Sequence, residues 1–437
     1  MPDKEQSLTD RIGQKLQNWG PFRRGFWRSP LRGPWITSVL SLMLLIFIPV
    51  VFVTGLLDHI AWNPGLGGTN NRTPDMGLLG FLVGIEWPTR PIWIYRLNQG
   101  VHLLVGLALV PIVLAKLWSI MPSLYKWPLA DSLGHALERI SILFLIGGIF
   151  FQFFTGLLYI QNFIIFDNFR FNQLHFYGNW IFMGGFVLHV LVKFPVMLES
   201  LKKRSLRKEM DTPRSETQPE PASEGRLVST DPALPSISRR RALALVGGSA
   251  LTLVALAFGQ TLGQRWRWLA ILSPRAQSIG DGPNDFRVNK TARKAGITPE
   301  MVGPGWRLEL VGKTRHSLRR EDLLAMPQHT SSLPIACLEG WSTGNQDWTG
   351  VRLRDLAKLA GIPNPAKVHF ESLEKEGTAR ESYMRRNQIL EPLSLLALRV
   401  NGVDLSLDHG YPARAIVPAS PGNRNTKWIY RMTFFEA

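Results

Sequence analysis

Five long apolar runs constrain most strongly what this 437-residue chain can fold into. A bilayer core is crossed by about 20 apolar residues in a helix. Runs near that length cover residues 36–57, 94–118, 140–160 and 174–198, and a fifth ends near residue 262. Tryptophans such as Trp35, Trp62 and Trp118 lie close to their ends, where indole rings favour the membrane interface. We therefore predict a multi-pass membrane protein of five spans, followed by a soluble domain.

The distribution of charge predicts the orientation of the spans. The formal net charge is +17, but the basic residues concentrate beside the spans, so we expect a lipid bilayer as partner and no nucleic acid. Lys and Arg are frequent in residues 1–35 and 201–208, whereas the loops after the first and third spans hold only Arg72, Arg90 and Arg170. Positive flanks stay inside, which predicts a cytoplasmic N-terminus and an extracytoplasmic C-terminal domain in the cell membrane.

Histidines within the predicted spans are candidate ligands, because polar side chains are costly there. His175 and His189 are fourteen residues apart on the fourth span. That is about 21 Å along a helix, on nearly one face. His102 on the second span lies at a depth comparable with His175. The spacing suits two haems stacked across the membrane; the alternative is a set of hydrogen bonds between helices.

The helical part resembles the four-helix cytochrome b subunits of hydrogenases and formate dehydrogenases. The shared features are the pairs Thr54-Gly55 and Thr155-Gly156 and the two histidines of the fourth span. The resemblance implies that His102 and His175 hold one haem b. A second haem would use His189, and the first span offers no histidine at that end; His135 is on the correct side. One or two haems are therefore expected.

Cys337 is the only cysteine of the chain. A lone thiol can be a small buried hydrophobe, a nucleophile or a ligand to a soft metal. The apolar residues Leu333 and Ile335 precede it, and Gly340, Ser342 and other turn-forming residues follow. This pattern predicts a thiol at the mouth of a strand, where a cofactor can reach it.

The pattern C-x-E-G-W-S followed by W-T-G-V-x-L around Cys337 resembles the sulfite oxidase superfamily, and within it the periplasmic methionine sulfoxide reductase catalytic subunit. The resemblance covers about residues 285–437. It implies an α+β fold with a mixed sheet, a molybdenum–molybdopterin cofactor, and Cys337 as the catalytic molybdenum ligand. Segments such as D-H-G-Y-P-A-R imply further cofactor contacts at Asn289, Ser372, His409, Arg414, Gly422, Arg424 and Lys427. For the arginines the alternative is a solvated basic face.

The sequence thus divides into five parts. We predict a basic cytoplasmic N-terminus at residues 1–35, an all-α four-helix haem bundle at 36–200, a disordered linker at 201–237, a fifth anchor helix at 238–264 and an extracytoplasmic molybdopterin domain at 265–437. The linker prediction follows from its Pro, Glu, Ser and Thr content. The motif Ser238-Arg239-Arg240-Arg241 at the start of the fifth helix reads either as ordinary basic flanking or as a twin-arginine export signal.

These features predict a membrane-anchored molybdenum oxidoreductase that performs oxygen-atom transfer. We expect it to pass electrons between a quinone pool, haem b and the molybdenum centre, with a sulfoxide or related oxidised small molecule or protein side chain as substrate. A separate redox subunit is a further expected partner. Two alternatives remain open: oxidation of sulfite or another substrate, and a haem conduit with a metal-free binding domain. Against sulfite, Glu339-Gly340-Trp341 stands where sulfite oxidases usually have Gly-Asn-Arg.

Overall fold

The computed structural model of the chain describes residues 15, 18–23, 25–62, 86–126, 132–161, 171–221, 227–272, 280–375 and 380–436. The chain separates into two compact units. One comprises Met1–Phe52 and Val105–Val254, and the other comprises Val53–Leu104 and Ala255–Ala437. The first is called the bundle unit below, and the second the catalytic unit.

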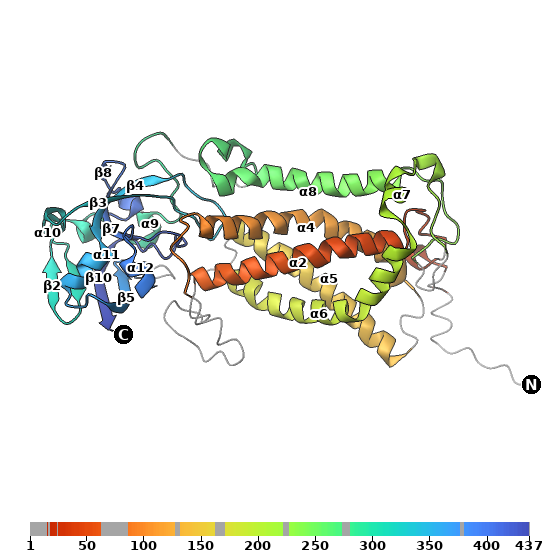
Figure 1. Ribbon diagram of the computed structural model, residues 1–437, viewed down its shortest axis with the longest axis horizontal. Coiled ribbons are helices and arrows are strands. Elements are labelled where there is room, and N and C mark those ends of the chain that lie inside the picture. Colours follow the sequence, from red (N-terminus) through yellow and green to blue (C-terminus); the bar gives the residue numbers. More distant parts are fainter. Residues whose placement is uncertain are drawn as a thin grey trace, which may run out of the picture. The chain divides into compact units, whose positions relative to one another are not determined.

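Five helices are long and apolar enough to cross a membrane. They are α2 (Pro34–Trp62), α4 (Ile94–Leu124), α5 (Leu133–Ile160), α6 (Phe171–Lys203) and α8 (Arg239–Leu262). Each matches one predicted apolar run, and α5 begins before residue 140 because its first turns carry polar residues that the apolar run does not include. Within the bundle unit, α5 packs against α6 (Figure 1). Ile48, Leu109 and Phe182 form a buried apolar cluster there.

The segment after α6 differs from the sequence expectation. Its described residues form a helix, α7 (Leu206–Asp211), and a short 3-10 turn, η3 (Arg214–Glu216), rather than a disordered linker. The Glu220 carboxylate accepts hydrogen bonds from the Trp35 backbone N–H at 2.9 Å and 3.2 Å, at the first turn of α2. Arg239, at the start of α8, pairs with Glu209 at 3.0 Å. Composition alone missed this order because it comes from a few long-range polar contacts.

The C-terminal part of the catalytic unit is an α+β domain with two five-stranded sheets. The first sheet has the order β2-β1-β10-β5-β6, and it is mixed because β1 and β10 run parallel while its other pairs are antiparallel. The second has the order β3-β4-β7-β8, with β9 also paired to β7, and all its pairs are antiparallel. The strands are β1 (Leu308–Val311), β2 (Arg315–Leu318), β3 (His329–Leu333), β4 (Gln346–Arg352), β5 (Pro365–Ser372), β6 (Glu381–Arg385), β7 (Leu395–Val400), β8 (Val403–Asp404), β9 (Arg414–Ile416) and β10 (Ile429–Glu436).

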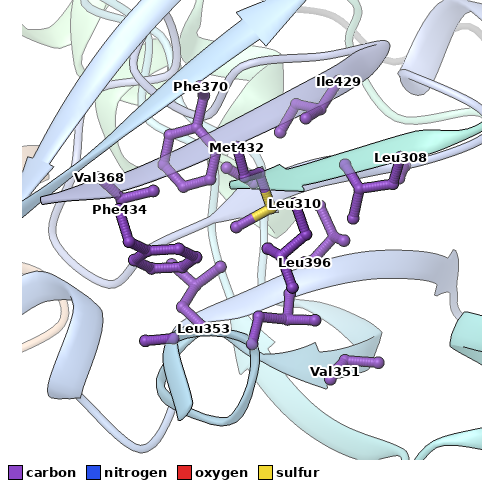
Figure 2. Close-up of a cluster of buried hydrophobic side chains, with 14 of the residues drawn as sticks. Leu308, Leu310, Val351, Leu353, Val368, Phe370, Leu396, Ile429, Met432 and Phe434 are labelled. Carbon is purple, nitrogen blue, oxygen red and sulfur yellow. The ribbon is translucent and has the colours of Figure 1, made fainter. Parts of the chain in front are cut away.

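The helix α9 (Ala292–Ala295) and the 3-10 turn η6 (Glu300–Val302) precede β1. The helices α10 (Arg320–Ala325), α11 (Leu353–Leu359) and α12 (Arg386–Leu390) and the 3-10 turn η7 (Leu407–His409) lie between strands, and the 3-10 turns η1 (Gly20–Phe22) and η4 (Gln264–Leu269) lie earlier in the chain. The largest core cluster lies between strands of both sheets and α11. Figure 2 shows Leu310, Met432 and Phe434 from the first sheet near Leu396 of β7 and Leu353 of α11. This core fixes the backbone from which the loops of the candidate site extend.

We predict that Glu220→Ala destabilises the bundle unit. Glu220 is 7% exposed and satisfies backbone donors that an α-helix leaves unpaired in its first turn. Loss of such a cap costs about 1–2 kcal/mol, so thermal unfolding of the detergent-purified chain should begin at lower temperature. Glu216→Ala is the matched control, because Glu216 is exposed on the same segment. Equal melting curves for the two variants would contradict the capping role.

Candidate active site

Cys337 lies four residues after the end of β3, and residues 337–342 are called the Cys337 loop. The backbone N–H of Cys337 donates to the Trp341 carbonyl at 2.8 Å, and the Gly340 N–H donates to the Cys337 carbonyl at 3.0 Å. These bonds close a tight turn in which Gly340 has a φ of +85°, a conformation that favours glycine. The side chain of Cys337 is only 6% exposed and packs with Ala270 and Trp341. The thiol thus lies in a buried turn just beyond the end of β3, and the sequence predicts it at the mouth of a strand.

The segment 418–428 lies against this loop. The Gly422 N–H donates to the Ala336 carbonyl at 2.7 Å, and Ala336 forms isolated β-bridges to both Pro421 and Ser342. The two segments that the sequence analysis assigned to one cofactor therefore meet through backbone hydrogen bonds, although about 80 residues separate them in sequence.

Two arginines are buried beside these loops, and a lysine is partly buried there. Arg414 and Arg424 are each 2% exposed. Arg414 donates to the carbonyls of His409 at 3.0 Å and Asn425 at 3.2 Å, and Arg424 donates to the Ala61 carbonyl at 3.2 Å. Lys427 Nζ donates to the Lys290 and Asp408 carbonyls at 2.7 Å and 2.8 Å. Within the described part of the chain none of the three forms an ion pair, and the Nε atoms of both arginines are buried without a hydrogen-bond partner.

This burial favours the neutral forms of the three cations. It lowers the pKa of Arg414 and of Arg424 to about 9, and it lowers the pKa of Lys427 well below its usual value. Burying a cation without an anion is costly. An anionic group in this region would offset that cost, and the phosphate of a molybdopterin is such a group. The donor set therefore fits the cofactor that the sequence resemblance implies.

The described residues contain no cluster of three or more His, Cys, Asp and Glu side chains that could hold a metal ion alone. A single thiolate is a sufficient protein ligand only where a cofactor supplies the remaining ligands. Cys337 with a pterin dithiolene meets that condition.

His409 is held as a neutral ring. It stacks on Phe286 with ring centroids 3.8 Å apart, and its Nε2 lies 2.9 Å from the Asn284 carbonyl, so the ring bears its proton on Nε2. Burial, and then the charge of Arg414, lower the pKa of His409 to about 3. The side chain supports the Arg414 region without carrying charge at neutral pH.

Two other predicted contacts are engaged with the backbone. The Ser372 hydroxyl donates to the Lys427 carbonyl at 2.7 Å, and Asn289 Oδ1 accepts from the Lys290 N–H at 2.8 Å. Ser372 thus fixes the end of segment 418–428. For Ser372 and Asn289, direct contact with a cofactor stays a prediction.

The helix histidines adjoin the Thr-Gly pairs noted in the sequence. In the catalytic unit, Thr54 Oγ1 lies 3.4 Å from His102 Nδ1, and a Cβ on Gly55 would lie 2.6 Å from His102 Cε1. In the bundle unit, Thr155 Oγ1 lies 3.1 Å from His175 Nδ1. With Nδ1 occupied by a threonine, a metal would be bound through Nε2, and the glycine allows the ring to approach the facing helix.

His189 lines a cavity of about 550 Å³ in the bundle unit. The lining is mostly aliphatic and aromatic, and its polar members include Ser41, Lys116, Arg139 and Lys193. No acidic side chain is among them. His135 lies in the first turn of α5, and its side chain is outside the described residues.

Trp87, Arg90 and Gln99 also hold the loops of the candidate site in place, and none of them was predicted from the sequence. Trp87 Nε1 donates to the Ala419 carbonyl at 2.7 Å, and Gln99 Nε2 donates to the Leu338 carbonyl. Arg90 pairs with Glu391 at 2.8 Å. These residues belong to no sequence motif. Their role in the site becomes clear only when the structure shows their partners Ala419, Leu338 and Glu391.

The C-terminal part of the chain is similar to a known family of domains. Residues 295–437 match the family model described as the oxidoreductase molybdopterin binding domain. The chain is 32% identical over 131 residues to the uncharacterized oxidoreductase YuiH of Bacillus subtilis (strain 168), which covers 30% of this chain and 65% of that protein. It is 31% identical over 163 residues to mitochondrial sulfite oxidase of Mus musculus, covering 31% of this chain and 30% of that protein.

A plant relative is similar over a shorter stretch. Sulfite oxidase of Arabidopsis thaliana is 34% identical over 107 residues, covering 21% of this chain and 27% of that protein. The solved sulfane dehydrogenase SoxCD from Paracoccus pantotrophus matches at 25% identity with a TM-score of 0.28, covering 31% of this chain and 39% of that one. The chain thus spans less than two thirds of the length of each of these relatives.

We predict that His409 makes stability depend on pH. An unfolded histidine binds a proton near pH 6.5, whereas folded His409 binds one only near pH 3. Between these values the unfolded state holds more protons, so stability falls as the pH falls below about 6.5, by up to about 1.4 kcal/mol per pH unit. Melting curves between pH 7 and pH 4.5 should therefore be less pH-dependent for His409→Asn than for the wild type. His316→Asn, on β2, is the control; an equal slope in His409→Asn and wild type would refute this assignment.

Proposed function

We propose that this chain, whose C-terminal part is a molybdopterin-binding domain of the sulfite oxidase family, is a membrane-anchored molybdenum oxidoreductase. One observation carries the proposal. The Cys337 loop and segment 418–428 are joined by the Gly422–Ala336 hydrogen bond beside buried cations that lack ion-pair partners among the described residues. A thiolate next to an anion-binding region is the protein contribution that a molybdopterin requires.

Each residue of the candidate site has a proposed role in binding the cofactor. Cys337 would hold the molybdenum through its thiolate, and Arg414, Arg424 and Lys427 would hold the pterin phosphate, with Gly422 allowing close backbone approach. When bound, the cofactor supplies two-electron oxygen-atom transfer, in which a sulfoxide, two electrons and two protons give a sulfide and water. The protein excludes bulk water, since Cys337 is 6% exposed.

The electrons would come from a quinol through haem b. His102 and His175 would hold the outer haem, supported by their threonine contacts at Nδ1. His189 would serve a second haem, and the cavity beside it, apolar with cationic side chains, suits a flat apolar ring bearing carboxylates. His135 would be a candidate for the second protein ligand of that haem.

The proposed location is the cell membrane, with a cytoplasmic N-terminus and an extracytoplasmic catalytic domain. Five apolar helices support the membrane part. Arg239 is buried and bonded to Glu209, which supports a structural role for it in the folded protein beside any role in twin-arginine export. A separate redox subunit would be a further partner.

The relatives named sulfite oxidase support a second candidate, in which sulfite is oxidised and electrons flow into the membrane. The Cys337 loop itself favours the first candidate. It has Trp341, whose Nε1 donates to Glu339 at 2.8 Å, and no arginine follows the cysteine within the loop. Assays in both directions separate the two candidates.

We predict that the detergent-purified chain contains close to one molybdenum per protein. In Cys337→Ser the metal loses its thiolate ligand, so activity should fall by more than about 100-fold, since even outer-shell partners of metals are worth 10–100-fold. Elemental analysis with an oxidoreductase assay measures both. Ser331→Ala, a buried small residue on β3, is the control for folding. Absence of molybdenum in the wild type, from a host that makes the cofactor, would refute the proposal and favour a haem protein with a metal-free binding domain.

We predict b-type haem in the same preparation. His102→Ala and His175→Ala should each remove about one haem per chain, because each deletes an axial ligand. His189→Ala should remove a second haem only if two are bound. The haem-to-protein ratio and the reduced-minus-oxidised spectrum give the result. His329→Ala, in the soluble domain, should leave the spectrum unchanged, and an unchanged spectrum in all the helix variants would exclude these ligands.

A further inference from the structure

The N-terminal turns of α4 cover the Cys337 loop. Gln99 Nε2 donates to the Leu338 carbonyl. A Cβ on Gly340 would lie 2.3 Å from Leu103 Cδ1 and 3.3 Å from Gln260 Nε2, so these side chains contact the loop directly. A helix side chain therefore touches the residue after the cysteine, and another touches the glycine of its turn.

The end of α8 contacts the other side of the same turn. Thr261 Oγ1 donates to the Gly340 carbonyl at 3.3 Å, and the Ser342 N–H donates to the Gln260 carbonyl at 2.9 Å. The Ser342 hydroxyl donates to the Thr261 carbonyl at 2.5 Å. Backbone and side-chain groups of the loop thus form hydrogen bonds with the last residues of α8.

The chain after α8 closes the remaining side. The Leu272 N–H donates to the Leu256 carbonyl at 3.2 Å, which turns the segment back along α8. This brings Ala270, 0% exposed, into one buried cluster with Cys337 and Trp341. We call Gln99, Leu103, Gln260, Thr261 and Ala270 the cover.

We infer that the cover restricts the reacting centre to small-molecule substrates and excludes oxidised side chains of folded proteins. This inference rests on the proposed function, which sets the chemistry beside Cys337. A peptide strand that pairs with a backbone lies about 5 Å from it, and the cover already occupies that space beside Leu338 and Gly340. Admitting a protein would break the Leu338, Gly340 and Ser342 bonds together and leave buried polar groups unsatisfied, which is costly.

Because Cys337 is the sole cysteine, thiol labelling measures the cover without catalysis. The full-length chain is purified from cells grown without molybdate, and its melting curve checks that it is folded. It reacts in parallel with N-ethylmaleimide and with a maleimide on a long polyethylene glycol chain. We expect the small reagent to react at least about tenfold faster in folded wild type, and the two rates to approach each other in Gln99→Ala/Thr261→Ala, since each lost bond to a buried group is worth about tenfold.

The matched control is Gln328→Ala/Thr314→Ala. Gln328 and Thr314 also donate side-chain hydrogen bonds to backbone carbonyls, at 2.8 Å to Leu323 and 2.8 Å to Leu359, away from Cys337. This variant should keep the wild-type ratio of labelling rates. Equal labelling by both reagents in folded wild type would overturn the inference.

The molybdenum-loaded enzyme supplies the second arm. With a reduced dye as electron donor, free methionine sulfoxide should be reduced, and a folded protein with oxidised surface methionines should not be reduced until Gln99 and Thr261 are replaced. Turnover of both substrates by wild type at similar kcat/KM overturns the inference and leaves the proposed function standing. Turnover of neither, with molybdenum present, overturns the proposed reductase function itself.

Discussion

The desolvation of three cations is the constraint on which the catalytic unit depends. Arg414, Arg424 and Lys427 are buried around two loops and, among the described residues, bind carbonyl oxygens rather than carboxylates. Carbonyl groups satisfy N–H donors but neutralise no charge, so the two arginines keep an unmet preference for an anion. Lys427 differs, because the carboxylates of Asp408 and Glu374 favour its charged form. That preference, next to a buried thiol, is what distinguishes a cofactor site from an ordinary core. The neutral ring of His409 completes the arrangement by adding no further positive charge.

Within the catalytic unit, the loops of the α+β domain depend on residues that precede this domain in the chain. Trp87 holds Ala419, Gln99 holds Leu338 and the Ala61 carbonyl receives Arg424. Each of these bonds joins a loop of the candidate site to a residue more than 200 positions earlier in the chain. The fold family therefore supplies the sheets and the cofactor loops, while the geometry around Cys337 also depends on residues from the apolar helices. This dependence explains why the thiol lies deeper than a strand end implies.

The sequence predicted what depends on composition and local motifs, and missed what depends on partners. The five helices followed from apolar length, whereas the roles of Cys337 and of Gly422, Arg424 and Lys427 rest on the resemblance to the sulfite oxidase superfamily. Leu395–Val400, which forms β7, is mostly apolar, and such a run does not distinguish a buried strand from a helix. The order of α7 and its neighbours, inside the predicted linker, was not foreseen for a similar reason: Glu220 and Glu209 look like solvated acids until Trp35 and Arg239 are placed beside them. The cofactor roles of Asn289 and Ser372, and the haem ligands, stay predictions.

The Glu220 cap also has a consequence for synthesis. Trp35 and Glu220 are 185 positions apart, and a ribosome adds about 5–20 residues per second. The first turn of α2 is therefore made roughly 10 to 40 seconds before its capping carboxylate exists. During that interval three further apolar helices, α4, α5 and α6, are synthesised, and the start of α2 relies on water for its unpaired N–H groups. The end of α2 nearest the N-terminus is thus the first part of the bundle to be synthesised and among the last to reach its final hydrogen bonding.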